Sequence, residues 1–290
     1  MIIKEALKDA LSLLGESSTA LIDVEVLLSF TLDVSKEYLI SHPDKEVEEA
    51  DMTLFKFYLE RLKSGEPLAY IINSKEFFSL DFYVDKRVLI PRPETEFLVE
   101  RSLNFLRNYE DVKGRFKVLE VGTGSGNISV SIAKSLLNEG VDAVEEILAL
   151  DVSEDALDVA KMNAEQHSVD YLIRFVQSDL LEAIDDGEEF DLIVANLPYI
   201  GESVHRHIDE NVEKFEPSLA LFAGENGLDL YEKLFLDLIT KNINFNLILI
   251  EFGFGQAEDF AIVVDKYFPG NWSIKQDLAG IDRFLIVTNN

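Results

Sequence analysis

Apolar residues recur every three or four positions through the first 72 residues of the chain. This spacing predicts amphipathic helices, over residues 3–14, 24–32 and 54–62. Gly15 follows the first of these helices as a stop signal, and Pro67 prevents the third from continuing. Because no alternating strand pattern interrupts this stretch, we predict a small helical-bundle domain over residues 1–72.

The periodicity changes after this bundle. The segment KEFFSLDFYVDKRVLI has alternating and aromatic positions with a polar break at Ser79–Asp81, which predicts a β-hairpin. Two prolines then extend the chain, and a helix running to about Tyr109 is expected to begin at Glu94 or Thr95. We interpret residues 73–95 as a connector between two domains.

In residues 96–290, apolar strand patterns alternate with helical patterns. Strands are predicted at residues 117–121, 147–151, 173–177, 191–195 and 246–251. Helices are predicted between several of them, at residues 128–138, 155–167 and 228–242. This alternation is typical of an α/β domain, in which a doubly wound parallel sheet has helices on both faces. Two final strands, 272–276 and 283–288, have only a short loop between them and predict a closing antiparallel hairpin.

The charge of the chain limits its partners. It has 26 Lys and Arg against 55 Asp and Glu, which gives a formal net charge of -29. Proteins that follow nucleic-acid phosphates use clustered basic residues, so the composition argues against DNA or RNA as a main partner. An anionic membrane surface would be repelled. Without a run of about 18 apolar residues or a signal-peptide pattern, the chain is expected to be cytoplasmic.

Cysteine is absent. Its absence excludes disulfides, thiolate catalysis and the usual zinc frameworks. His205 and His207 lie two positions apart with acidic residues nearby, but no distant set of ligands accompanies them. We therefore interpret that segment as a solvated loop and predict no metal site.

A glycine-rich turn, Glu120-Val-Gly-Thr-Gly-Ser-Gly126, leaves the first strand of the α/β region. Its glycines allow a tight turn and let a ligand approach bare N–H groups. Asp151 ends the second strand, where a carboxylate can accept hydrogen bonds from both ribose hydroxyls or act as a charge at the next helix's amino end. Asp179 and Leu180 follow the third strand and are positioned to face an adenine ring. These residues predict an adenosine-containing cofactor, with NAD and S-adenosylmethionine both open.

The fourth strand runs into Asn196-Leu197-Pro198-Tyr199. Open α/β sheets bind ligands at the carboxyl ends of their strands, beside the first glycine turn. The Asn196 carboxamide oxygen and the Leu197 carbonyl are two adjacent acceptors that can hold a planar –NH2 group, and Tyr199 would provide an aromatic wall. The alternative is a simple turn with a packed tyrosine. We favour a site that receives an amino or amide nitrogen.

These motifs together resemble class I S-adenosylmethionine-dependent methyltransferases that act on planar amino or amide nitrogens. More of the chain, from its helical start to its last strand, is similar to one branch, the release factor glutamine methyltransferases. This similarity lies in Gly65-Glu-Pro-Leu-Ala-Tyr70, Phe77-Phe78, Leu89-Ile-Pro-Arg-Pro-Glu-Thr-Glu96, Phe215-Glu-Pro217 and Leu249-Ile-Glu251. The family usually has proline where this chain has Leu197. The role implied at that position is a backbone carbonyl, which leucine also supplies.

The resemblance implies a Rossmann-like class I methyltransferase domain over residues 96–290. Its strand order would be 3-2-1-4-5-7-6, with the last strand antiparallel. The implied cofactor is S-adenosyl-L-methionine, the product is S-adenosyl-L-homocysteine, and the acceptor is the side-chain amide nitrogen (N5) of a glutamine. That glutamine would lie in the Gly-Gly-Gln loop of peptide chain release factors, and the helical domain, residues 1–72, would dock this protein substrate.

The resemblance also implies roles for individual residues. Asp151 would hold the ribose, and Asp179 with Leu180 the adenine. The rest of the cofactor would lie against Asn196 and the glycine turn, residues Gly122, Thr123, Gly124, Ser125 and Gly126. Catalysis would use the acceptor motif, Asn196, Leu197, Pro198 and Tyr199. Arg92 and Glu94 would lie near the cofactor or form a structural ion pair.

Alternatives from other classes remain open at this stage. One is an adenine-N6 methyltransferase acting on ribosomal RNA, because such enzymes have a motif similar to Asn-Leu-Pro-Tyr. The second is a glutamine methyltransferase acting on a ribosomal protein, and the third is a catalytically silent adenosine-binding adaptor. The charge and the connector motif argue against RNA, and the intact acceptor motif argues against the adaptor. We expect a monomer.

Overall fold

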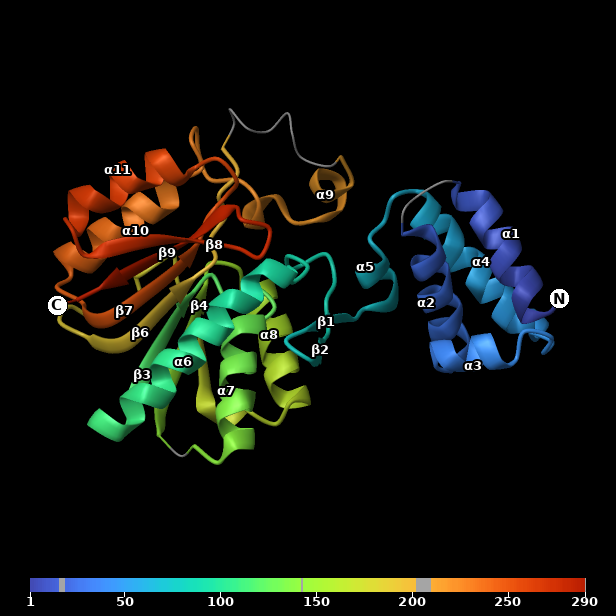
Figure 1. Cartoon of the computed structure of the whole chain (residues 1–290), viewed down its shortest axis with the longest axis horizontal. Coiled ribbons are helices and arrows are strands. Elements are labelled where there is room, and N and C mark those ends of the chain that lie inside the picture. Colours follow the sequence, from blue (N-terminus) through green and yellow to red (C-terminus); the bar gives the residue numbers. More distant parts are fainter. Residues whose placement is uncertain (16–18, 142, 202–209, 290) are drawn as a thin grey trace. The chain divides into compact units, whose positions relative to one another are not determined.

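The computed structural model describes residues 1–15, 19–141, 143–201 and 210–289. The chain divides into two compact units, Met1–Ser74 and Lys75–Asn290. The first unit is built from helices, and the second is built around a β-sheet (Figure 1). Over the described ranges, no helix is both long enough and apolar enough to cross a membrane.

The first unit packs its helices around one apolar core. Its helices are α1 (Ile3–Leu14), α2 (Ala20–Leu32), α3 (Lys36–Ser41), α4 (Glu49–Lys63) and α5 (Leu68–Ile72). Helix α1 ends where Gly15 adopts a left-handed φ of 75°, a conformation that costs glycine little. Helix α5 begins directly after Pro67. The predicted helical character of this region is confirmed.

A short hairpin opens the second unit. It consists of β1 (Lys75–Phe77) and β2 (Leu80–Phe82). The predicted turn at Ser79–Asp81 is wrong, because the two turn residues are Phe78 and Ser79, with φ of 51° and 59°. Two consecutive left-handed residues are typical of the tight turns that join antiparallel strands, although glycine or asparagine is the usual choice.

Burial rather than turn propensity determines the register of this hairpin. Phe77 and Phe82 are both buried in the core of the second unit. Moving the turn by one residue would rotate one of these rings to the opposite face. The backbone N–H of Phe78 also donates to Oε1 of Glu96 at 2.9 Å, which helps hold the unusual turn.

The main sheet has seven strands in the order β5-β4-β3-β6-β7-β9-β8. These are β3 (Phe116–Val121), β4 (Val144–Asp151), β5 (Ile173–Gln177), β6 (Glu189–Ala195), β7 (Asn244–Glu251), β8 (Trp272–Gln276) and β9 (Asp282–Thr288). Strands β3 to β7 pair in parallel, and β9 is antiparallel to both β7 and β8. Counted from β3, this is the predicted order 3-2-1-4-5-7-6, so the doubly wound sheet and its closing hairpin are confirmed.

Helices cover both faces of this sheet (Figure 1). The 3-10 helix η1 (Pro93–Thr95) leads directly into α6 (Glu96–Lys113). One face of the sheet packs against α6, α7 (Asn127–Glu139) and α8 (Glu154–Gln166). The other packs against α10 (Asp229–Thr240) and α11 (Ala257–Tyr267). Helix α11 and the short α9 (Glu210–Phe215) were not predicted from the sequence pattern. The alternation of β3 explains the two layers, because Leu119 and Val121 face one core and Val118 the other.

Candidate active site

The carboxyl ends of the central strands are aligned. Val121 on β3 lies opposite Leu150 on β4 and Ala195 on β6. The residues that follow these three therefore stand side by side at one edge of the sheet: Gly122, Asp151 and Asn196. A pocket lies at this edge, where open α/β sheets place their ligands. Eight of the residues implied by the family resemblance line it: Arg92, Gly122, Thr123, Gly124, Ser125, Asp151, Asn196 and Pro198.

The glycines of the turn differ in what surrounds them. At Gly122, with φ of 79°, a Cβ atom would lie 2.8 Å from Cδ2 of Leu197. At Gly126 a Cβ atom would lie 3.1 Å from the Cβ of Ala160 on α8, so this glycine allows helix packing. At Gly124, with φ of 53°, a Cβ atom would meet nothing within 4 Å. Gly124 is therefore the position at which the turn presents a bare backbone to the pocket.

Asp151 holds the glycine turn in place. Its Oδ2 accepts a hydrogen bond from the Gly124 N–H at 2.8 Å, and its Oδ1 accepts from the Ser153 N–H at 2.9 Å. Burial raises the pKa of this carboxyl, and the backbone N–H donors partly oppose the increase. Each oxygen keeps a second lone pair, so Asp151 can accept from ligand hydroxyls while it supports the loop.

Glu120 lies beneath the same turn and is 1% exposed. Its Oε2 accepts from the Thr123 hydroxyl at 2.7 Å and from the Ser129 N–H at 3.2 Å. Its Oε1 has no hydrogen-bond partner among the described residues. Burial raises the pKa of this carboxyl to about 7. Glu120 thus braces the loop from below and does not line the pocket.

Asn196 is oriented by a chain of two buried side chains. Its Nδ2 donates to Oγ1 of Thr95 at 3.1 Å, and the Thr95 hydroxyl donates to Oε2 of Glu251 at 2.7 Å. Thr95 is 2% exposed and Glu251 is 1% exposed. Within the described part of the chain, no group donates to Oδ1 of Asn196. The side chain therefore offers a fixed acceptor at the edge of the pocket.

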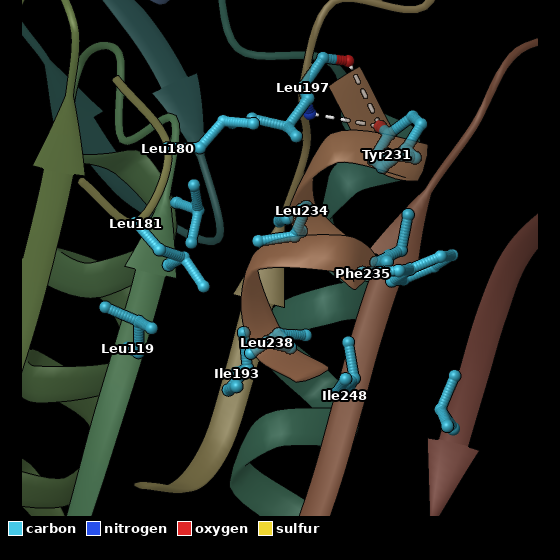
Figure 2. Packing of buried hydrophobic residues seen from close by; sticks show 14 of the residues in the cluster. Leu119, Leu180, Leu181, Ile193, Leu197, Tyr231, Leu234, Phe235, Leu238 and Ile248 are labelled. Atoms are coloured by element: carbon cyan, nitrogen blue, oxygen red, sulfur yellow. Dashed lines mark hydrogen bonds between the residues drawn. The ribbon is translucent and has the colours of Figure 1, made fainter. Parts of the chain in front are cut away.

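The backbone of Leu197 is held by Tyr231 on α10 (Figure 2). The Leu197 N–H donates to the Tyr231 hydroxyl oxygen at 3.1 Å, and that hydroxyl donates to the Leu197 carbonyl at 3.1 Å. The Glu251 carbonyl lies 2.5 Å from the same hydroxyl, whose single proton can be donated to only one of the two carbonyls at a time. A carbonyl has two lone pairs, so the Leu197 oxygen can accept one further hydrogen bond. The leucine side chain is buried among the apolar residues of the sheet.

Tyr199 is packed beside Gly253, where an added Cβ would lie 2.9 Å from the tyrosine ring. Its backbone carbonyl accepts from Nε2 of Gln256 at 2.8 Å. Burial raises the pKa of the Tyr199 hydroxyl to about 12, so the side chain is neutral at physiological pH. Tyr199 is absent from the described pocket lining.

Two guanidinium groups line the pocket. Arg87 forms a bidentate pair with Asp85, from Nε to Oδ1 at 2.9 Å and from Nη2 to Oδ2 at 2.7 Å, and Arg92 pairs with the buried Glu216 at 2.6 Å. Glu216 also accepts from the Ile90 N–H at 3.2 Å. Both cations keep further N–H groups for a ligand, because one guanidinium carries five donors. Arg87 and Arg92 thus line the same pocket as the carboxylate of Asp151.

Other residues suggested by the sequence lie elsewhere. Asp179 forms an ion pair with Lys233 at 2.9 Å, and the Leu180 side chain is buried in the apolar core. Together with Gly126 and Leu197, they are missing from the part of the pocket wall that the structure describes. His205 and His207 lie outside the described residues.

Sequence reasoning missed three residues of the site. The sequence identifies Thr95 as a possible helix start and as part of the motif ending at Glu96, but does not indicate that it links Asn196 to Glu251. Arg87 was not singled out, and its position two residues after Asp85 was the available signal. Tyr231 lies in the middle of a helical pattern, where nothing distinguishes it from an ordinary core tyrosine.

Comparisons with known proteins address the identity of this fold and site. Residues 5–72 match the family model described as PrmC N-terminal domain, and residues 113–226 match a methyltransferase domain. A release factor glutamine methyltransferase of Koribacter versatilis is 34% identical over 288 residues, covering 99% of this chain and 98% of that protein. One from Clostridium acetobutylicum is 35% identical over 293 residues, covering 99% and 98%. The chain belongs to the release factor glutamine methyltransferase family.

Solved structures support the fold expected for this family. The catalytic domain of hMettl16, in complex with a MAT2A 3′UTR hairpin, has a TM-score of 0.53 and 15% identity, covering 83% of this chain and 82% of that chain. A second crystal form of the METTL16 methyltransferase domain has a TM-score of 0.51 and 13% identity, covering 90% and 91%. At such low identity the likeness concerns the fold alone, and the class I methyltransferase fold is confirmed.

Proposed function

We propose that this protein transfers a methyl group from S-adenosylmethionine to the side-chain amide nitrogen of glutamine in the Gly-Gly-Gln loop of a peptide chain release factor. The observation that carries the proposal is the orientation of Asn196. Its amino group is committed to Thr95, which leaves Oδ1 as an acceptor at the pocket edge. The relatives named as release factor glutamine methyltransferases support the same substrate.

The reaction requires orientation more than acid–base chemistry. An amide nitrogen is a poor nucleophile, because its lone pair is delocalised into the carbonyl. Oδ1 of Asn196 and the free lone pair of the Leu197 carbonyl would each accept one N–H of the substrate amide and fix its plane. These bonds would strengthen as the nitrogen becomes positive, so they favour the transition state over the ground state. Tyr199 and Pro198 would complete the motif around the amide.

The pocket residues also fit the cofactor. S-adenosylmethionine, when bound, supplies an electrophilic methyl group on a sulfonium. Arg87 and Arg92 would bind its carboxylate, and Asp151 would accept hydrogen bonds from the ribose hydroxyls. The bare Cα of Gly124 leaves room for close approach. Asp179 and Leu180 would contact the adenine through their backbone, because the Asp179 carboxylate is paired with Lys233 and the Leu180 side chain is buried in the apolar core.

The helical unit would bind the release factor. Residues 5–72 match the PrmC N-terminal domain model, whereas the pocket lining comes from the second unit. We infer that residues 1–72 dock the protein substrate and contribute little to cofactor binding. The net charge of -29 argues against RNA in this role.

A methyl-transfer assay with labelled cofactor tests the proposal. A purified release factor, its Gln→Ala loop variant and ribosomal RNA are offered separately to wild type and to Asn196→Ala. We expect label in the wild-type factor alone, and we expect Asn196→Ala to abolish transfer while cofactor affinity by calorimetry stays within a few-fold. Equal turnover by Asn196→Ala would contradict the mechanism, and label in RNA alone would contradict the substrate.

A further inference from the structure

Thr95 joins three elements that are distant in sequence. It ends η1, Asn196 follows β6, and Glu251 ends β7. The register explains why they meet, because Ala195 lies opposite Ile250 and the next residues of the two strands are therefore neighbours. The Thr95 hydroxyl lies between them and is bonded to both, at 3.1 Å and 2.7 Å.

A hydroxyl group has only one proton, and this limits the possible directions of the hydrogen bonds from Asn196 through Thr95 to Glu251. An ionised carboxylate accepts hydrogen bonds and donates none, so Thr95 must donate its proton to Glu251. Its oxygen can then only accept from Asn196. The amino group of Asn196 is thereby held toward Thr95, and Oδ1 is left for the pocket.

Protonation of Glu251 would remove this constraint. The carboxylic acid could donate to Thr95, whose own proton could then be donated to Oδ1 of Asn196. The carboxamide would turn by half a rotation and present its amino group to the pocket. A donor in that place would face the N–H groups of the substrate amide instead of accepting from them.

We propose that Thr95 and Glu251 are positioning residues that set the direction of the Asn196 carboxamide, so that the enzyme is active only when Glu251 is ionised. The inference rests on the proposed function, because it assigns the acceptor oxygen of Asn196 to the substrate amide. Beyond the proposed function, it states that the protonation state of Glu251 decides whether Asn196 presents an acceptor or a donor to the pocket.

The surroundings of Glu251 put this switch near neutral pH. Burial raises the pKa of Glu251 to about 7, and the Thr95 hydrogen bond and Arg283 oppose the increase. The titratable and charged groups that face it come from β9, η1, the connector, the acceptor motif and α10: Arg283, Glu94, Arg92, Tyr199 and Tyr231. Because the ionised form is the productive one, activity should rise as pH increases through about 7.

Matched variants of Thr95 separate positioning from packing. Thr95→Ser keeps the hydroxyl, and Thr95→Val keeps the shape without it. We expect Thr95→Ser to stay within a few-fold of wild type and Thr95→Val to lose about 10–100-fold in kcat with little change in KM for the release factor. Glu251→Gln should flatten the rise of kcat/KM with pH. Equal kcat in the two Thr95 variants, or an unchanged pH profile in Glu251→Gln, would overturn the proposal.

An NMR titration tests the switch without substrate. The side-chain –NH2 signals of Asn196, assigned by their loss in Asn196→Ala, should shift with a midpoint near the pKa of Glu251 in wild type and Thr95→Ser. They should not titrate in Thr95→Val. If wild type methylates the release factor and these signals do not titrate, the switch fails and the proposed function stands. If the signals titrate and no release factor is methylated, the proposed function fails instead.

Discussion

The buried carboxyl of Glu120 should make the second unit less stable as pH rises. Its ordinary pKa is 4.5, and burial raises the pKa to about 7 in the folded protein. Between these values the unfolded chain loses the proton while the folded protein retains it, so the free energy of unfolding falls with increasing pH. Above the pKa of the folded protein, Glu120 is ionised in both states, and the free energy of unfolding stays lower by the full cost of burying the charge.

The pKa values give the size of this effect. At about 1.4 kcal/mol per pH unit, ionising Glu120 in place costs about 3 kcal/mol. Near the sequence pI of about 4.4 the net charge vanishes and the protein would self-associate, so the low end of the range is unusable. From about pH 5.5 upward, about 2 kcal/mol of the decrease should remain measurable.

Glu120→Gln removes the ionisation and keeps the shape of the side chain. Trp272, the single tryptophan, lies on β8 of the second unit, so its fluorescence reports unfolding of that unit in urea. The free energy of unfolding of Glu120→Gln, relative to wild type, should rise by about 2 kcal/mol between about pH 5.5 and about pH 8.5. Costs of the amide that do not depend on pH cancel in this difference. The exposed Glu165→Gln on α8 is the control. If Glu120→Gln and wild type lose stability in parallel over this range, the reasoning is refuted.

Further predictions concern the loop, its support and the helical unit. Gly122→Ala and Gly124→Ala both place alanine at positive φ, at about 1–2 kcal/mol each. Only Gly122→Ala also displaces Leu197, so this variant should unfold at a lower urea concentration than Gly124→Ala. Gly124→Ala should chiefly weaken cofactor affinity, measured by calorimetry. Tyr231→Phe removes a hydroxyl that accepts from the Leu197 N–H and donates to one of two nearby carbonyls, and should cost about 1–3 kcal/mol in urea unfolding. Deleting residues 1–72 should reduce release-factor methylation far more than cofactor affinity, and equal losses in the two assays would exclude a docking role.

Local patterns predicted the sheet because its central strands are mostly buried. The apolar runs that became β3, β4, β6 and β7 are covered by helices on both faces, so they stand out from their neighbours. The hairpin turn was misplaced because Phe78 and Ser79 have no preference for left-handed φ. Contacts with the core and with Glu96 impose that conformation, and such contacts cannot be read from the hairpin's own sequence.

The site was predictable only where its residues belong to contiguous motifs. The glycine turn and the segment beginning at Asn196 could be read from the chain in order. The bond between Thr95 and Glu251 spans 156 positions, and it exists because η1 lies over the aligned ends of β6 and β7. The strand predictions ended β6 and β7 correctly, and combining their ends with the strand order would have brought Glu251 beside Asn196. The role of Thr95 depends on tertiary structure alone.

Strand β9 lies between β7 and β8 although it follows both in sequence. Among the described strands, β8 pairs with β9 alone, so it cannot join the sheet before β9 is available. During synthesis, β7 therefore exposes an unpaired apolar edge until residues 282–288 emerge, and such edges promote aggregation. Once these residues are available, β9 can pair with β7 and β8 can pair with β9, which closes the sheet. Chaperone dependence of folding should accordingly be governed by this final step and not by the formation of the parallel strands.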